Sequence, residues 1–136
     1  MAAAKELYRI IDANFNRSKE GLRVCEDMAR FVWDDKMLSA AFKKIRHDLN
    51  GAVEPLGLLK VLSFRDIQKD VGKATTASEL KRSALNDIFW ANSQRVKESL
   101  RVLEEVTKLL DVQTSQSIKD LRYKVYAIEQ KAFKQR

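Results

Sequence analysis

An internal repeat is the feature that most constrains the fold of this chain. Residues 13–32 align without gaps to residues 91–110, and nine of twenty positions are identical. Downstream of each copy, Phe42-Lys-Lys-Ile-Arg46 resembles Ile118-Lys-Asp-Leu-Arg122. Apolar residues recur at steps of three and four in both copies, which is the period of an amphipathic helix. The chain is therefore predicted to be an all-α, pseudo-twofold helical bundle of two repeated long-helix/short-helix units.

The repeat sets the expected boundaries. A first helix is predicted from about residue 4 to 32 and a second from Leu38 to Val53, with Ser39, Asp34 or Asp35 capping its start and Pro55 and Gly57 ending it. One domain over residues 1–136 is expected, with halves at about 4–62 and 77–134.

The connection between the halves is predicted to be a polar loop over residues 63–76. Thr76-Ala-Ser-Glu79 has the spacing of a capping box, so a third helix is expected to begin there and run to about Leu110. Residues 111–117 are predicted to be a polar break before the last helix.

Composition excludes several classes of protein. Only four Gly and one Pro occur among 136 residues, which argues against β-sandwiches, barrels and Gly-rich phosphate loops. Cys25 is the single cysteine, so a disulfide framework and a multi-cysteine metal site are excluded. No apolar run approaches the roughly 20 residues of a membrane span, and no signal peptide is recognised, so a cytoplasmic protein without membrane contact is expected.

The net charge of +7 favours an anionic partner, either nucleic acid or a phosphorylated metabolite. Charges of both signs are interspersed along the chain, and this pattern is weak evidence for nucleic acid.

Six polar residues are retained in both copies of the repeat. They are Asn14/Asn92, Arg17/Arg95, Lys19/Lys97, Glu20/Glu98, Arg23/Arg101 and Glu26/Glu104. Asn14 and Arg17 are predicted to interrupt a stripe of apolar residues that points inward, where an amide and a guanidinium need partners. Gly21 and Ser99 lie one turn further on and leave space between helices, so a polar pocket is expected.

Two interpretations of these residues stay open. Arg17 could pair with Glu98 or Glu20 in a network that fixes the register of the helices, and Lys19 and Lys97 could form a solvated face. Alternatively, Arg17 and Arg95 could hold a phosphate from two sides, because a guanidinium matches phosphate oxygens with two parallel hydrogen bonds.

The loop and the single histidine supply further candidates. Arg65-Asp66 and Asp70-Val-Gly72-Lys73 offer carboxylates for a divalent cation and a glycine that permits close backbone approach. An ordinary polar connection is the alternative for this loop. His47 is a candidate ligand-binding residue, although a lone histidine more often has a structural role.

Together these motifs resemble a known family. Asp12-Ala-Asn14-Phe-Asn16-Arg17, Glu20-Gly-Leu-Arg23, Arg46-His47-Asp48 and the loop motifs are similar to the small helical hydroxymethylpyrimidine phosphate kinases of bacterial thiamine synthesis. Members occur alone or as the N-terminal domain of thiamine phosphate synthase. The resemblance implies transfer of the γ-phosphoryl group of ATP to 4-amino-5-hydroxymethyl-2-methylpyrimidine phosphate, with Mg²⁺. Two departures are Lys69-Asp-Val-Gly-Lys73 in place of Gly-Asp-Val-Gly-Thr, and Ser99 in place of alanine.

Chemical roles follow as hypotheses. The catalytic candidates are Arg17, Arg95, Asp70 and Arg46, and the Mg²⁺ ligands are Asp66 and Asp70. The candidates for binding substrate or phosphate are Asn14, Glu20, Arg23, His47, Arg65, Gly72, Asn92, Glu98 and Arg101.

Other functions remain open at this point. The alternatives are a catalytically silent accessory domain of thiamine phosphate synthase, a basic helical nucleic-acid-binding module and a protein-interaction bundle. Homodimerisation and association with a thiamine phosphate synthase are also open.

Overall fold

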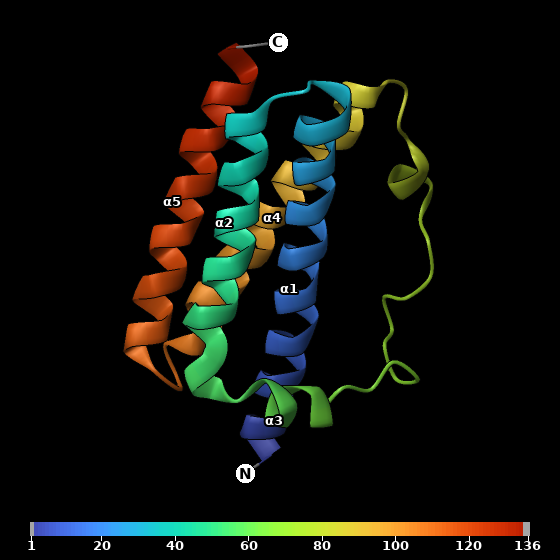
Figure 1. The fold of residues 1–136 in the computed structure, drawn as a ribbon. Helices are drawn as coiled ribbons and strands as arrows, with labels where there is room; N and C mark the ends of the chain where they lie inside the picture. Colours follow the sequence, from blue (N-terminus) through green and yellow to red (C-terminus); the bar gives the residue numbers. More distant parts are fainter. Residues whose placement is uncertain (1, 135–136) are drawn as a thin grey trace.

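Four long helices form the body of the molecule in a computed structural model that describes residues 2–134 (Figure 1). They are α1 (Ala2–Asp27), α2 (Lys36–Val53), α4 (Leu85–Thr107) and α5 (Val112–Lys134). Over these residues the chain contains no strand. The prediction of an all-α helical bundle is confirmed.

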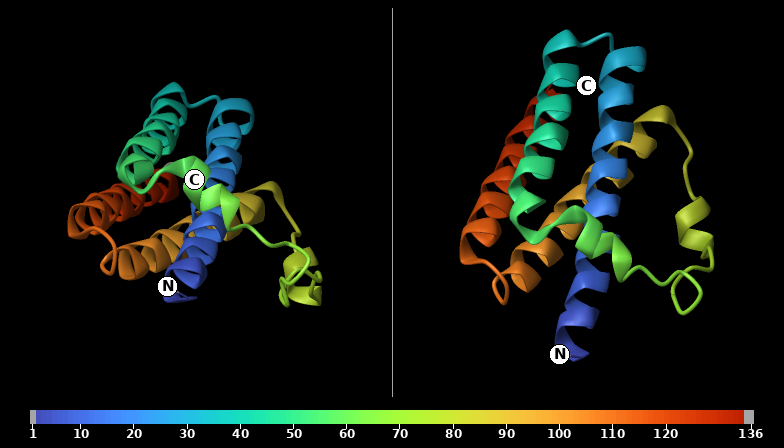
Figure 2. Two further views of the ribbon diagram at one scale, coloured as in Figure 1. Left: turned by 90° about the horizontal axis from the view of Figure 1, so that it is seen from below. Right: turned by 60° about the horizontal axis from the view of Figure 1, so that its bottom comes forward.

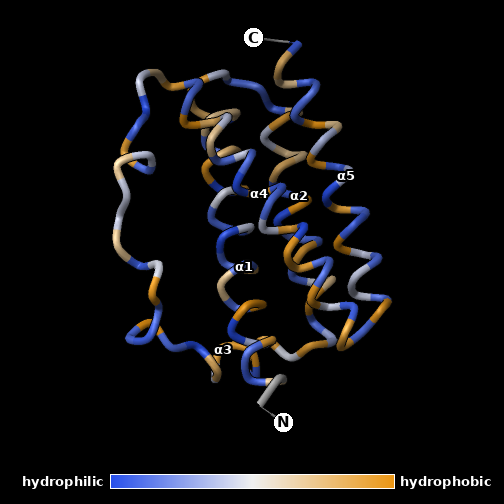
Figure 3. The backbone as a smooth tube through the Cα atoms, turned by 180° about the vertical axis from the view of Figure 1, so that it is seen from behind, coloured by the Kyte–Doolittle hydropathy of each residue, from blue (hydrophilic) through white to orange (hydrophobic). Residues whose placement is uncertain are grey.

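The helices pack as two hairpins. α1 contacts both α2 and α4, and α5 contacts both α4 and α2, so each long helix has two neighbours (Figures 1 and 2). Each hairpin is one copy of the repeat. Apolar and polar residues alternate along every long helix (Figure 3), as expected when one face of a helix is buried and the other is hydrated.

The two halves meet where α1 crosses α4. Gly21 on α1 is buried, and a Cβ atom there would lie only 2.7 Å from Cγ2 of Val96 and 3.1 Å from the carbonyl oxygen of Asn92. The absence of a side chain at this position allows the two helices to approach closely. The space predicted beside Gly21 is therefore filled by the neighbouring helix.

Aromatic side chains fill the end of the core where α1 gives way to α2. Phe89 is fully buried and contacts the rings of Trp33, Trp90 and Phe42 at centroid distances of 4.8, 4.9 and 5.9 Å. These inclined ring arrangements are favourable for aromatic pairs.

The two long helical stretches of the first half end at the predicted residues, Val32 and Val53, and α2 begins at Lys36, two residues before its predicted start. α1 continues into a π-helical turn, Met28–Val32, so the helical stretch ends at the predicted residue. The side chain of Asp35 accepts a hydrogen bond from the Leu38 amide at 2.9 Å and caps α2. Gly57, with φ of 77°, follows a short 3-10 turn (Glu54–Leu56) and precedes the short helix α3 (Leu58–Ser63).

The predicted start of the third helix is wrong. Residues 77–80 form only a 3-10 turn, and α4 begins at Leu85. The Thr76 hydroxyl contacts the Ser78 hydroxyl at 3.1 Å and caps no backbone amide. Instead Asp87 accepts hydrogen bonds from the amides of Ser83 and Ala84.

The predicted polar break at 111–117 is also wrong, because α5 begins at Val112. Asp111 caps this helix, since its carboxylate accepts hydrogen bonds from the amide of Gln113 at 3.2 Å and the hydroxyl of Thr114 at 2.7 Å. Polar residues at a helix start are its caps and first turn, and they do not interrupt it.

A long irregular connection joins the two halves. Every residue from 67 to 84 is exposed, and this segment, here called the strap, runs along the outside of the bundle beside α1 (Figures 1 and 2). Within the described residues, no helix is both long and apolar enough to span a membrane.

Candidate functional site

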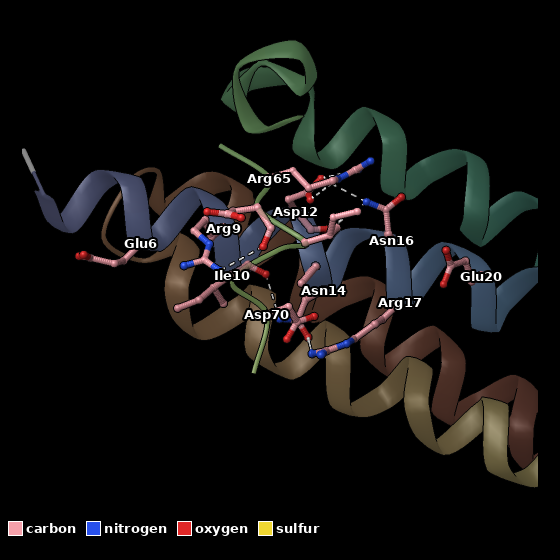
Figure 4. Close-up of a pocket in the computed structure, with 13 residues that line it drawn as sticks. Glu6, Arg9, Ile10, Asp12, Asn14, Asn16, Arg17, Glu20, Arg65 and Asp70 are labelled. Atoms are coloured by element: carbon pink, nitrogen blue, oxygen red, sulfur yellow. Dashed lines mark hydrogen bonds and ion pairs between the residues drawn. The ribbon is translucent and has the colours of Figure 1, made fainter. Parts of the chain in front are cut away.

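A polar groove lies between the first half of α1 and the beginning of the connection to α4 (Figure 4). Its volume is about 750 Å³, which is in the range of small-molecule sites. The side chains that line it are Glu6, Arg9, Ile10, Asp12, Ala13, Asn14, Asn16, Arg17, Glu20, Arg65, Asp66, Ile67 and Asp70. Six of the predicted site residues are in this set.

An ion pair holds the connection against α1. The guanidinium of Arg65 donates two hydrogen bonds to the carboxylate of Asp12, at 2.7 and 2.8 Å (Figure 4). Asp12 is buried, and its carboxylate also accepts a hydrogen bond from the side-chain amide of Asn16 at 3.2 Å. The hydrogen bonds to Asp12 raise the pKa of Arg65 above its usual value. Arg65, predicted to bind substrate, thus forms one wall of the groove and is already paired.

Asn14 and Arg17 occupy different environments. Asn14 is buried, and its side-chain amide donates to the carbonyl of Ile10 at 2.9 Å. Arg17 is exposed at the groove, and its guanidinium donates to the Asn14 side-chain oxygen at 3.4 Å. The expectation that both interrupt an inward stripe therefore holds for Asn14 only. Asn92 repeats the Asn14 bond, because its amide donates to the carbonyl of Ile88 at 2.8 Å.

The paired arginines of the repeat are not brought together in this groove. Arg17 lines it, whereas Arg95 is exposed on α4 and is not among the lining residues. The groove therefore presents an arginine from one half of the repeat only. A phosphate clamp made by both arginines finds no support in this arrangement.

Glu26 and Glu104 form equivalent ion pairs in the two halves. Arg46 on α2 donates to Glu26 at 3.1 Å, and Arg122 on α5 donates to Glu104 at 2.9 Å. Both glutamates are buried, so each pair joins the long helix of its half to the shorter one. Hydrogen bonding to Glu104 raises the pKa of Arg122. Arg46, predicted to be catalytic, is thus placed in a structural pair outside the groove.

The remaining predicted residues lie elsewhere on the surface. Arg23 pairs with Asp27 at 3.5 Å, and Arg101 pairs with Glu104 at 3.1 Å. Glu98 accepts a hydrogen bond from Gln94 at 3.0 Å. His47 is exposed and lines a separate hollow between α2 and α3. None of these residues lines the groove, and neither does Gly72, which was predicted to bind substrate.

The two predicted magnesium ligands do share the groove. One carboxylate oxygen of Asp66 accepts from the amide of Lys69 at 3.2 Å, and one of Asp70 accepts from the amide of Gly72 at 2.9 Å. Both aspartates are left with acceptor capacity. Across residues 2–134 no three His, Cys, Asp or Glu side chains are grouped as a metal site. A Mg²⁺ ion here would need further oxygens from a ligand, as is common for this ion.

Four polar lining residues are not among the predicted site residues: Glu6, Arg9, Asp12 and Asn16. Their spacing with Arg17 and Glu20 follows one face of a helix, and this periodicity could have identified them. The repeat does not mark Glu6, Arg9 and Asp12, because its aligned copies begin only at residues 13 and 91.

The fold and the groove define a class: a small all-α domain with a polar groove on its surface. The chain belongs to the ThiD2 family, whose sequence model matches residues 9–131. It is 39% identical over 127 residues to a thiamine-phosphate synthase of Rhodopirellula baltica and 41% identical over 127 residues to one of Thermosynechococcus vestitus. These matches cover 93% of this chain, and the chain spans about a third of the length of these curated relatives, 34% and 35%. No solved structure matches the chain.

The relatives contradict one prediction. The resemblance implied an ATP-dependent pyrimidine phosphate kinase, but the curated relatives are named thiamine-phosphate synthase, which is a different enzyme. The prediction of kinase activity is therefore wrong by this comparison. Membership of the family stands, while its narrower identification as a stand-alone kinase does not.

Proposed function

We propose that this chain is an accessory domain of thiamine biosynthesis that acts together with the catalytic part of a thiamine-phosphate synthase. The observation that carries the proposal is the coverage of the relatives: nearly all of this chain corresponds to about a third of each synthase. Such a region is large enough to fold as a domain of its own.

The groove suggests what this domain binds. Its lining combines guanidiniums (Arg9, Arg17), amides (Asn14, Asn16) and carboxylates (Glu20, Asp70). A phosphorylated aminopyrimidine has complementary groups, because its phosphate accepts hydrogen bonds from guanidiniums and its amino group donates to carboxylates. Mg²⁺ held by Asp66 and Asp70 could accompany the phosphate. ATP was expected only as the phosphoryl donor of a kinase, so we propose no step that uses it.

The proposed role is to bind the pyrimidine substrate near the synthase. Two linked modules raise the effective concentration of a shared ligand without new contacts. The domain itself needs no catalytic group for this role, which fits the structural pairing of Arg46 with Glu26.

The test joins this chain through a flexible linker to a synthase catalytic chain and compares the fusion with the catalytic chain alone. Thiamine phosphate formation is measured at limiting pyrimidine substrate, with and without this chain, and binding of 4-amino-5-hydroxymethyl-2-methylpyrimidine phosphate and its pyrophosphate is measured by calorimetry. We expect binding to this chain and a lower apparent KM of the synthase. An unchanged KM together with no detectable binding of either pyrimidine contradicts the proposal.

A further inference from the structure

The charge of the groove is the starting point for a further inference, which rests on the proposed function. Five carboxylates line it, against three guanidiniums. Asp12 and Arg65 neutralise each other, so four carboxylates remain against Arg9 and Arg17. A phosphorylated ligand in the open groove would therefore meet more negative than positive charge. Cations beyond Arg9 and Arg17 would therefore strengthen its binding.

The strap carries such cations. Lys69, Lys73, Lys81 and Arg82 are exposed, against only Asp70 and Glu79 among the acidic residues of the segment. Lys69 and Lys73 flank Asp70, which already lines the groove. A short movement of this part of the chain would carry both ammonium groups toward a ligand beside Asp70.

The strap is also weakly held in the structure. Ile67, Val71 and Leu80 expose 65%, 104% and 74% of their surface, so little of their apolar area is buried. The hydrogen bonds within the strap join residues close in sequence, such as the Gly72 amide to the Asp70 carboxylate and the Lys81 amide to the Ser78 carbonyl. Segments with few buried apolar contacts open and close at low cost in free energy.

Its two ends, in contrast, are anchored. Arg65 is fixed to Asp12 just before the strap, Arg9 donates to the carbonyl of Asp66 at 3.4 Å, and Asp87 caps α4 just after it. Ile10 on α1 and Ile67 on the strap both line the groove and both are exposed. Closure would bury these two side chains against the flat ring of a pyrimidine, which favours the closed state.

We propose that the strap closes over the groove when a phosphorylated aminopyrimidine binds, and that Lys69 and Lys73 then contact the phosphate. The competing explanation is that Mg²⁺ alone neutralises the phosphate and the strap stays open.

Trypsin provides a direct readout, because it cleaves after lysine and arginine and the strap exposes four such sites. Brief digestion followed by mass spectrometry is carried out on the full chain with no ligand, with pyrophosphate, and with 4-amino-5-hydroxymethyl-2-methylpyrimidine phosphate, each with Mg²⁺ or EDTA. We expect cleavage after Lys69, Lys73, Lys81 and Arg82 to slow about tenfold or more with the pyrimidine phosphate, because a closed segment is cleaved only when it reopens. Pyrophosphate alone should protect less, since it lacks the ring that Ile10 and Ile67 would cover.

A Lys73→Gln variant tests the lysine contact, with Lys124→Gln on α5 as a control of equal charge change on another exposed site. Lys73→Gln should weaken binding of the pyrimidine phosphate about fivefold in calorimetry and reduce protection of the remaining sites, whereas Lys124→Gln should leave both unchanged. Circular dichroism should be the same for both variants.

The outcomes separate this inference from the proposed function. Binding of the pyrimidine phosphate without protection of the strap overturns closure and leaves the proposed function standing. Binding and protection that depend on Mg²⁺ but are unaffected by Lys69→Gln and Lys73→Gln overturn the role of the lysines. No binding to the wild-type chain overturns both proposals.

Discussion

The hydroxyl oxygens of Ser18 on α1 and Ser99 on α4 lie 2.6 Å apart at the buried crossing of the two helices. In the repeat, Ser18 corresponds to Val96 and Ser99 to Gly21. The pseudo-symmetric counterpart of this hydrogen bond is therefore the contact of Val96 with Gly21. At two equivalent points of the crossing, the helices are therefore joined by different contacts: two hydroxyl groups at one point, and a valine side chain packed on a glycine at the other.

This relationship predicts a coupling between two substitutions. Ser18→Val alone should lower the free energy of unfolding by about 1–3 kcal/mol, because the added methyl groups meet Ser99 in a packed site. Ser18→Val combined with Ser99→Gly copies the Val96–Gly21 pair and should recover part of that loss. Urea unfolding of both single variants and the double variant gives the coupling energy. Additive losses would mean that the two contacts are not equivalent.

Gly21→Ala should destabilise the protein although alanine favours helices. The new Cβ would lie 2.7 Å from Cγ2 of Val96, so the helices must separate, at a cost of about 1–3 kcal/mol. Gly51→Ala on α2 is the matched control, since a Cβ there meets nothing within 4 Å. That variant should gain about 0.5–1 kcal/mol from helix propensity. In urea unfolding, the free energy of unfolding should fall for Gly21→Ala and rise for Gly51→Ala. A fall in both variants would show that the close approach of the helices does not cause the loss at Gly21.

The two Glu–Arg pairs should differ in their effect on stability. The side chains of Glu104 and Arg122 are 6% and 9% exposed, whereas Arg46 is 23% exposed beside Glu26. Arg46→Met leaves Glu26, which is 5% exposed, without an ion-pair partner among the described residues and should cost about 3 kcal/mol. Arg122→Met should cost less, because Arg101 still pairs with Glu104. Thermal unfolding followed by circular dichroism measures both losses. If Arg46→Met instead abolishes ligand binding without loss of stability, Arg46 belongs to the binding site.

Arg17 and Arg95 form a matched pair for testing the groove. Both are exposed and occupy equivalent positions of the repeat, but only Arg17 lines the groove. Arg17→Gln should weaken binding of the pyrimidine phosphate roughly tenfold through loss of one charged hydrogen bond, and Arg95→Gln should leave affinity unchanged. Calorimetry measures the affinity of both variants for the pyrimidine phosphate. Equal losses would indicate a ligand held by both halves.

Cys25 should be unreactive in the folded protein. Burial, reinforced by the negative charge of Glu129, raises the pKa of its thiol from 9.0 to about 12. The thiolate that reacts with disulfide reagents is therefore almost absent at pH 8, and labelling should require unfolding. Because the folded pKa is the higher one, this contribution to stability is complete below about pH 9 and is lost as the pH rises from 9 toward 12. Cys25→Ala should show a weaker decline in stability over that interval. Rapid labelling at pH 8 under native conditions would contradict the burial.

Much of the fold could be predicted because the repeat and the helical period are local patterns. The first helix ended at Val32 as expected, and the cap at Asp35 was among the residues anticipated. The start of α4 was not predicted correctly. Thr76 has the spacing of a cap, but the residues after it have no apolar face to bury. A cap stabilises a helix that packing already favours, and it does not create one.

The site was harder to predict than the fold. The repeat singles out the glutamates and arginines that both copies retain. In the structure, Glu26 and Glu104 form ion pairs that join the helices within each half. The pair that shapes the groove, Arg65 with Asp12, links residues 53 positions apart and has no counterpart in the repeat. Its geometry depends on the path of the connection after α3, which no local pattern reveals.

The path of that connection also explains why α1 and α4, the equivalent helices of the two copies, need not have the same function. When two copies of an ancestral unit become joined end to end, a single linker results, and it can cover the surface of only one copy. Fusion alone therefore makes the surfaces of the two copies different. The copy that the linker passes thereby gains a second wall for a groove, and the other copy does not.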